Sequence, residues 1–304
     1  MQIRVLGSAA GGGFPQWNCN CLNCSGVRQG SIKAQARTQS SIIVGNGSPD
    51  WALINASPDI LTQIKNTAVL QPARQMRDSG IAAVVLMDAQ VDHVTGLMML
   101  RERNSPLPIY ATQQVFEDLT TGLPLVKTLS HYCKVDQHLI QPDQDSFSIP
   151  ELAGIGFKPV VLSSKAPPYS PHRHDPHPGD NIGLLITELA TGKKAFYAPG
   201  LGLIEPQVEQ AMQEADVLLV DGTFWTDDEM ISSGLSSKRA IDMGHLAQSG
   251  SGGMIEALAP YSSKRRILIH INNTNPILRE DSPQALELKA LGIEVAYDGM
   301  HIEI

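Results

Sequence analysis

The stretch from Val84 to Gly96, VVLMDAQVDHVTG, constrains the fold more than any other part of the chain. Its continuous apolar run is typical of a strand covered on both faces, and we predict a buried strand over Ala82–Met87. Acidic and histidine side chains follow at once, in the sequence DAQVDH at positions 88–93, before an apolar helix. In layered α/β folds, sites form where strands end in loops. The stretch therefore predicts such a fold, with a site at the end of this strand.

Short strands and helices alternate along the whole chain. Period-2 and continuous apolar runs predict strands at Ile3–Gly7, Ser41–Val44, Trp51–Ala56, Ala82–Met87, Pro108–Ala111, Gly156–Leu162, Gly183–Leu189, Lys194–Ala198, Val217–Asp221, Arg266–Ile271 and Glu294–Ile304. Helical spacing and capping residues predict helices at Pro58–Lys65 with Ser57 as N-cap, Thr112–Thr121 with Thr112 as cap, Glu205–Glu214 and Gly253–Leu258. No linker divides the chain, so we expect one domain over residues 1–304. Two αβ halves favour an α/β fold of the αββα sandwich type, and a doubly wound sheet also fits the pattern.

The composition narrows the class of protein. The net charge of −8 argues against a nucleic-acid surface, and the one basic run, Lys264-Arg265-Arg266, enters a buried strand. No run of about 18 apolar residues is present, so we expect no membrane span. A strand begins at Met1 without room for a signal peptide, and three of the four cysteines lie within six residues. We therefore expect a cytoplasmic protein.

Polar side chains follow three apolar strands. Asp92 and His93 follow the first, His270 ends Arg266–Ile271, and Asp221 ends Val217–Asp221. Each alone is also explained as a solvated strand end, or for Asp92 as a helix N-cap. Together they predict a site with carboxylate and imidazole ligands, which suit Zn, Mn or Fe(II).

Other histidines are weaker candidates. His172, His174 and His177 crowd the loop Ser163–Asp180, which is either a polar surface loop or a metal or substrate-entrance site. His177 is the strongest of the three because a strand follows it directly. His245 is a candidate general acid or base, or a phosphate contact.

Cys19, Cys21 and Cys24 form a separate motif. Three thiols at this spacing on an Asn- and Gly-rich loop predict one tetrahedral structural zinc, in a Cys-rich loop near residues 13–30. The fourth ligand is open: His301, the loop of Asn273 and a water are candidates. The glycine-rich segment 7–13 lacks the Lys-Ser/Thr and the helix of a phosphate loop.

Taken in order, these segments resemble the tRNase Z-like branch of the metallo-β-lactamase superfamily over nearly the whole chain. VLGSAAGGGFPQWNCNCLNC resembles the branch's glycine-rich first loop in its zinc-carrying form, and DAQVDH stands where the His-x-His-x-Asp-His motif is usual. HPGDNIG resembles the third-motif histidine, and HINNTNP the last ligand histidine. Within that branch, NCNCLNC, MDAQVDH, DGTFW, MGHLAQSG and HINNTNP resemble the B proteins of pyrroloquinoline quinone (PQQ) biosynthesis.

The resemblance implies a changed metal site. Carried over, Asp92, His93 and His270 hold one metal. At the second metal position, Asp88 and Gln90 stand where the family has histidines, and Pro199-Gly200 stands where it has the bridging aspartate. A hydroxide bridging two zinc ions is therefore not expected. Two histidines and one carboxylate match the facial triad of non-haem Fe(II) oxygenases, although Zn or Mn would fit the same ligands.

The resemblance also implies a function. We expect a metal-dependent, Fe(II) oxygenase that hydroxylates the tyrosine ring of a Glu-Tyr-derived PQQ precursor, a small molecule or short peptide, among other PQQ-pathway proteins. Asp221 and His245 would move protons or orient the substrate. Asp88, Gln90 and His177 would support the metal or offer alternative ligands. The alternatives are a non-catalytic carrier of PQQ or its precursor, and a degenerate metallo-hydrolase.

Overall fold

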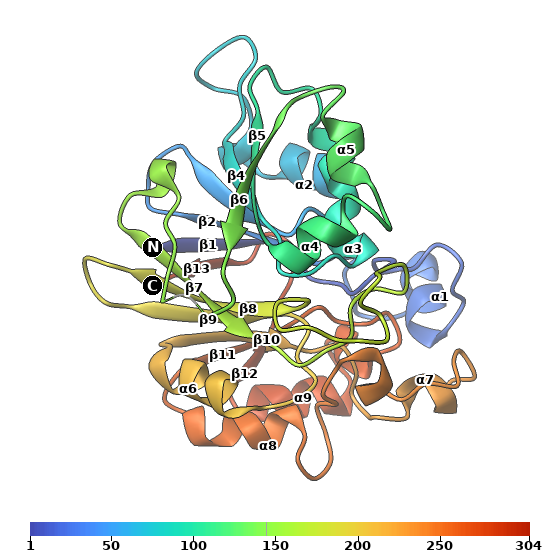
Figure 1. Ribbon diagram of the computed structural model, residues 1–304. Coiled ribbons are helices and arrows are strands. Elements are labelled where there is room, and N and C mark those ends of the chain that lie inside the picture. The colour runs from blue at the N-terminus through green and yellow to red at the C-terminus, as the bar shows by residue number, and fades with distance from the viewer. Residues whose placement is uncertain (144) are drawn as a thin grey trace.

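Two β-sheets pack face to face in the computed structural model, which describes residues 1–143 and 145–304 (Figure 1). The first sheet has the strand order β13 (His301–Glu303), β1 (Gln2–Gly7), β2 (Ser41–Gly45), β3 (Trp51–Ile54), β4 (Ile81–Val85), β5 (Leu107–Thr112), β6 (Val135–Ile140). The second has the order β12 (Ile293–Val295), β11 (Arg265–Ile269), β10 (Val217–Asp221), β9 (Lys194–Ala198), β8 (Ile182–Glu188), β7 (Ile155–Val161).

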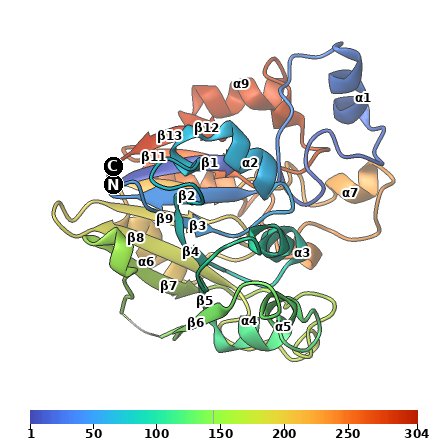
Figure 2. The same ribbon diagram turned by 90° about the horizontal axis from the view of Figure 1, so that it is seen from above.

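Helices lie on the outer side of each sheet, as the view from above also shows (Figure 2). The first sheet is covered by α2 (Ile60–Asn66), α3 (Val91–Val94), α4 (Gln113–Asp118) and α5 (Leu125–Leu129). The second is covered by α6 (Pro206–Glu214), α8 (Met254–Leu258) and α9 (Pro283–Ala290). The remaining α-helices lie within the segments that connect strands: α1 (Leu22–Gln29) between β1 and β2, and α7 (Glu229–Ser232) between β10 and β11.

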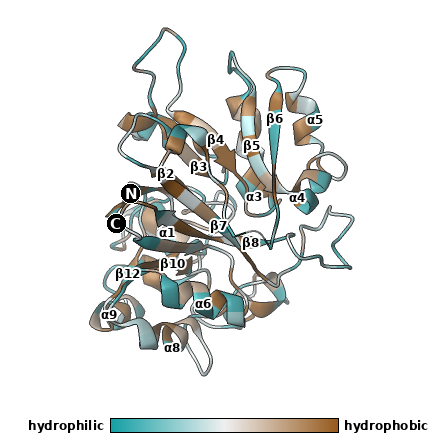
Figure 3. Cartoon of the chain, turned by 60° about the vertical axis from the view of Figure 1, so that its left-hand side comes forward, coloured by the Kyte–Doolittle hydropathy of each residue, from teal (hydrophilic) through white to brown (hydrophobic). Residues whose placement is uncertain are grey.

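Alternate side chains of one strand enter different cores. In β10, Val217 and Leu219 point between the sheets, whereas Leu218 and Val220 pack under the outer helices. Because successive strand side chains face opposite sides, a strand covered on both faces needs an unbroken apolar run. Figure 3 shows this as brown along β2, β3 and β4, with teal on the outward parts of α6. The predicted αββα sandwich is confirmed.

The parallel strands bring their carboxyl ends to one rim of the sandwich. Strands β3 to β6 run parallel to one another, and so do β9 to β12. Backbone hydrogen bonds join the two sheets at this rim: Ala10 N–H donates to Ile271 O and Ile182 N–H donates to Met87 O, each at 2.9 Å. The loops that follow β4, β10 and β11 therefore meet.

Most predicted elements are found within one or two residues, and Lys194–Ala198 and Val217–Asp221 have the predicted bounds. The prediction of one strand over Glu294–Ile304 is wrong, because the segment turns and forms β12 in one sheet and β13 in the other. Thr112 caps α4 as predicted, its Oγ1 accepting from Val115 N at 3.3 Å.

Ser57 is not an N-cap. Its hydroxyl accepts from Asp59 N in a tight turn, and α2 begins only at Ile60. No predicted element corresponds to α1, α5, α7, α9 or the half-exposed β6, because their side chains lack a clear apolar period. Among the described residues, no helix is long and apolar enough to cross a membrane.

Asp298 fastens the first loop to the sandwich. One carboxylate oxygen accepts from the backbone N and hydroxyl of Ser8, at 3.0 and 2.8 Å, and the other from those of Thr38, at 2.6 and 2.8 Å.

We predict that Asp298→Ala lowers the free energy of unfolding by about 3 kcal/mol, because the donors of Ser8 and Thr38 lose a charged acceptor. Urea unfolding would measure this loss. Glu102→Ala, at a side chain 70% exposed, is the control; equal losses in both variants would contradict the prediction.

Candidate metal centre

Asp92, His93 and His270 come from the two sheets and meet at one point. Asp92 and His93 lie in α3, just after β4, and His270 directly follows β11. Asp92 Oδ2 is 3.7 Å from His93 Nε2 and 3.6 Å from His270 Nε2. The ligand atoms of the three side chains all lie within 4.8 Å of one another. One carboxylate oxygen thus faces two imidazole nitrogens.

Local backbone geometry sets these positions. Gln90, not Asp92, is the N-cap residue of α3, so the alternative explanation of Asp92 as an N-cap is wrong. Asp92 and His93 sit in the single turn of α3. His270 has φ +61°, in the left-handed region that non-glycine residues rarely adopt. Such strain persists where surrounding contacts hold the residue in place, often at functional sites.

Asp88 orients His93. The two oxygens of Asp88 lie 2.8 and 2.9 Å from His93 Nδ1, which leaves Nε2 pointing at Asp92. His93 Nε2 is buried and has no hydrogen-bond partner among the described residues. Burial opposes protonation, but the charges of Asp88 and Asp92 raise the pKa of His93 to about 9. The site therefore attracts a positive charge at this nitrogen.

Thr223 orients His270. Its hydroxyl lies 2.6 Å from Asp221 Oδ1, which can only accept, so the hydroxyl proton goes to Asp221. The Thr223 oxygen then accepts from His270 Nδ1, at 2.9 Å. His270 consequently turns a lone pair on Nε2 toward Asp92. Burial, reinforced by the nearby imidazoles, keeps the pKa of His270 below its ordinary value.

Asp92, His93 and His270 are called the triad below. His245 and Asp221 form a dyad beside it. His245 Nδ1 is 2.6 Å from Asp221 Oδ2, and its ring stacks on that of His270 at 5.2 Å. Asp221, His245 and His270 also lie close enough to hold an ion. The hydroxyl of Thr223 already satisfies the Nδ1 atom of His270 and contacts that of His245 at 3.0 Å. This second group is therefore a hydrogen-bond network.

The first group fits one divalent cation. It offers two imidazole nitrogens and one carboxylate oxygen, and the imidazole N–H groups are held by Asp88 and Thr223, the usual supports of metal-bound histidines. Around Asp88, Gln90 and Gly200, the described residues offer no comparable set of ligands for a second metal. Both oxygens of Asp88 already face His93. Gly200 has no side chain that could bind a metal, and a Cβ atom placed on it would have only the His245 ring within 4 Å, at 4.0 Å.

A cavity of about 290 Å³ opens above the triad. Besides Asp88, Gln90, Asp92, His93, His245 and His270, its lining includes Asn181, Thr223, Phe224, Met243 and Asn272. Sequence reasoning missed Thr223, although it follows Asp221 by two residues at the end of an apolar strand. It also missed Asn181, the residue of the HPGDNIG segment that reaches the cavity.

His177 does not reach the site. Its ring lies 4.4 Å from that of His172, its Nε2 is 3.4 Å from Asp175, and it does not line the cavity. The prediction of a catalytic or ligand role for His177 is wrong, because the loop turns at Asp180, which accepts from His177 N at 2.7 Å. His172 instead pairs with Glu117 at 3.1 Å.

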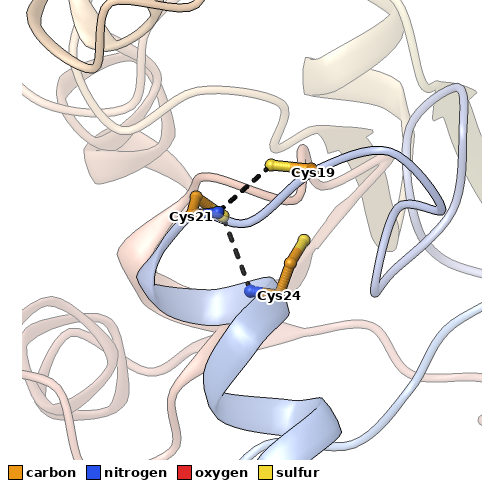
Figure 4. A group of neighbouring side chains, drawn as sticks. All are labelled: Cys19, Cys21 and Cys24. Atoms are coloured by element: carbon orange, nitrogen blue, oxygen red, sulfur yellow. Dashed lines mark hydrogen bonds between the residues drawn. The ribbon is translucent and has the colours of Figure 1, made fainter.

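Cys19, Cys21 and Cys24 point toward one another at the start of α1 (Figure 4). Burial raises the pKa of Cys24 to about 11, whereas backbone and thiol hydrogen bonds outweigh burial and lower the pKa of Cys21. His301 lies on β13 beside Arg4 and is not part of the cluster, so it cannot be the fourth ligand in this fold. The Asn273 amide nitrogen faces all three sulfurs, at 3.1 to 3.7 Å.

Thr223→Val removes the acceptor that fixes the His270 ring. We predict that it weakens Zn²⁺ or Fe²⁺ binding by about 10–100-fold, the usual cost of losing a partner of a metal-bound histidine. Thr223→Ser keeps the hydroxyl and should retain the affinity. Titration against a competing chelator gives the ratio. Unchanged binding by the valine variant would show that Thr223 does not orient His270.

Glu229 gives the fold a pH dependence. It accepts from Trp225 N at 2.6 Å and from the Thr274 hydroxyl, and burial raises its pKa from 4.5 to about 7. The folded state binds this proton more tightly than the unfolded state, so stability is lost as pH rises from about 4.5 through 7.

We predict that the free energy of unfolding falls by about 2 kcal/mol more in the wild type than in Glu229→Gln between pH 5.5 and 8. Parallel pH–stability curves for the two proteins would contradict this.

Comparisons with known proteins agree with this geometry. The model of the beta-lactamase superfamily domain matches residues 50–271, which include every residue of the triad and the dyad. A diphosphatase of the PhnP family has the same fold, with a TM-score of 0.70 at 18% identity over 100% of this chain and 96% of its own.

Closer relatives share the whole length. Coenzyme PQQ synthesis protein B of Methylobacillus flagellatus is 62% identical, and that of Cupriavidus necator 60% identical, each over 99% of both chains. The crystal structure of Zn²⁺-bound PqqB from Methylobacterium extorquens covers 100% of both chains, with 35% identity and a TM-score of 0.89. The chain therefore belongs to the coenzyme PQQ synthesis protein B family within the beta-lactamase superfamily, and its function lies in PQQ biosynthesis.

Proposed function

We propose that this protein is an Fe(II) oxygenase that hydroxylates the tyrosine-derived ring of a Glu-Tyr PQQ precursor. Asp92, His93 and His270 hold the metal. The observation that carries the proposal is the single Asp92 oxygen facing two imidazole nitrogens, at 3.6 and 3.7 Å. A metal held by two histidines and one carboxylate keeps open positions for O₂ and substrate and can support oxygen chemistry.

The side chains around the triad have separate tasks. Asp88 and Thr223 fix the ring orientations of His93 and His270. His245 lines the cavity, and because Nδ1 is directed at Asp221, its Nε2 is free to take a proton from the substrate's phenol. The buried Asp221 carboxylate stabilises the resulting imidazolium, as acid–histidine pairs do in general base catalysis.

Two features support a metal-bound protein within the PQQ pathway. The relative from Methylobacterium extorquens is a Zn²⁺-bound protein, and Zn or Mn would also fit the triad here. Cys19, Cys21 and Cys24 hold a structural zinc in this proposal. The Asn273 amide N–H₂ donates to the sulfurs, and the fourth ligand is a water or another group of the Asn273 loop. The precursor comes from other proteins of the pathway.

The proposal is tested with protein reconstituted anaerobically with Fe(II) and given a glutamyl-tyrosine precursor. Without a reductant, we predict O₂ uptake together with a product heavier by two oxygens, because both atoms of O₂ then enter the ring. With added ascorbate as a two-electron donor, a product heavier by one oxygen is also expected, and the second oxygen atom leaves as water. His93→Ala and His270→Ala should lower the rate more than about 100-fold, because each removes a metal ligand. His301→Ala, on the exposed face of β13, is the matched control and should keep the rate.

The outcomes separate the candidate functions. Full hydroxylation by the two triad variants would contradict the assignment of the metal. Tight binding of unmodified precursor or PQQ without O₂ uptake would indicate a carrier. Phosphodiester turnover with added Zn or Mn would indicate a hydrolase, which is disfavoured because Gln90 and Gly200 line the cavity without an imidazole or carboxylate ligand.

A further inference from the structure

Three cationic side chains line the cavity above the triad: Lys165, Arg173 and Lys238. They come from two loops, one before β8 and one after α7. The chain as a whole is acidic, with a net charge of −8. Three aspartates line the same cavity, but their carboxylates have other partners: Asp88 and Asp92 face His93, and Asp242 accepts from Arg239 N. The three cations are therefore left for a ligand.

None of the three is neutralised within the described part of the chain. Arg173 donates to the Ala166 carbonyl oxygen at 2.6 Å, and no carboxylate lies within ion-pair distance of Arg173, Lys165 or Lys238. Other cations in the chain do pair: Lys193 with Asp216 and Lys194 with Glu214, at 2.7 and 2.6 Å.

The two cationic loops are packed together at the cavity. The bond from Arg173 to Ala166 holds the guanidinium beside the segment that carries Lys165. A Cβ built on Gly244, in the loop after Lys238, would lie only 2.5 Å from Ser164 Oγ. Asp242 lines the cavity on the Lys238 loop, and its carboxylate accepts from Arg239 N at 3.0 Å. Cations around one cavity repel one another, and an anionic ligand would relieve the repulsion.

The cavity also offers a surface for a flat ring. Phe224, Met243 and Pro168 also line it. Phe224 meets the His245 ring edge-on, with centroids 5.8 Å apart. At about 290 Å³ the cavity suits a small molecule, because cavities for drug-sized ligands begin near this volume.

We propose that Lys165, Arg173 and Lys238 form a carboxylate-recognition rim that selects a small aromatic ligand with two or more carboxylates. This inference rests on the proposed function for the position of the ring, which the rim holds over Asp92, His93 and His270. The rim supplies binding and orientation, not chemistry. Arg173, with its guanidinium fixed by Ala166, is the best placed of the three to hold a carboxylate through two N–H groups.

The test measures binding without turnover. Metal-loaded protein under anaerobic conditions is titrated with PQQ, a tricarboxylate, and with its trimethyl ester. We expect PQQ to bind at least about tenfold more tightly than the ester at low salt, since charge-assisted hydrogen bonds are lost with the charges. The preference should fall as salt is added, because these charges lie at an open mouth.

Rim variants locate the effect. Lys165→Gln and Lys238→Gln should each weaken PQQ binding about threefold to tenfold and leave ester binding unchanged. Arg173→Lys, which keeps the charge but not the planar fork, should weaken it less than Arg173→Gln. Lys65→Gln, on α2 and outside the cavity, is the control.

Equal binding of PQQ and ester, or rim variants that bind PQQ as wild type does, would overturn the rim. The result is independent of O₂ uptake. If the protein binds PQQ through the rim but consumes no O₂ with the precursor, the oxygenase proposal fails and the rim stands. If precursor is hydroxylated but the charge variants have no effect, the rim fails and the oxygenase stands.

Discussion

The site depends on one constraint: two imidazoles from different sheets must turn their Nε2 atoms toward the same oxygen of Asp92. His93 reaches this point from the first sheet and His270 from the second. Neither ring is free to turn, because Asp88 holds one and Thr223 the other. The backbone bonds that join the two sheets at this rim keep the two halves in register. The ligand geometry is therefore set before any cation arrives, which lowers the cost of binding one.

The cysteine cluster and the triad are mechanically connected through the loop after His270. Asn23 donates to the carbonyl oxygens of Asn273 and Asn275, at 3.1 and 2.9 Å. Asn275 in turn donates to the carbonyls of Gly222 and Thr223. The same loop thus touches the three thiols on one side and the residue that orients His270 on the other. A structural metal at the thiols would stiffen this connection, since metal-binding free energy adds to folding free energy.

The sequence predicted the fold and the triad because their signals are local. Apolar runs that end in Asp or His mark buried strands and the rim where they terminate, and the structure brings Asp92, His93 and His270 together there. The failures involve long-range geometry. His177 lies next to a strand in sequence, yet its loop turns it outward to Asp175. The sequence offers His301 as a candidate fourth ligand of the cysteine site, but His301 lies on β13, which pairs with β1 in the first sheet. No local pattern reveals which sheet a short strand joins.

Anomalous diffraction at the iron edge, from anaerobic crystals of the Fe(II)-loaded protein, tests the metal assignment most directly. A single metal held by Asp92, His93 and His270 gives one iron peak per active site, about 2.0–2.2 Å from His93 Nε2, His270 Nε2 and an oxygen of Asp92. A zinc-edge peak among Cys19, Cys21 and Cys24 would provide an internal reference. Two iron peaks, or one peak held by Asp221 and His245, would contradict a single metal held by the triad.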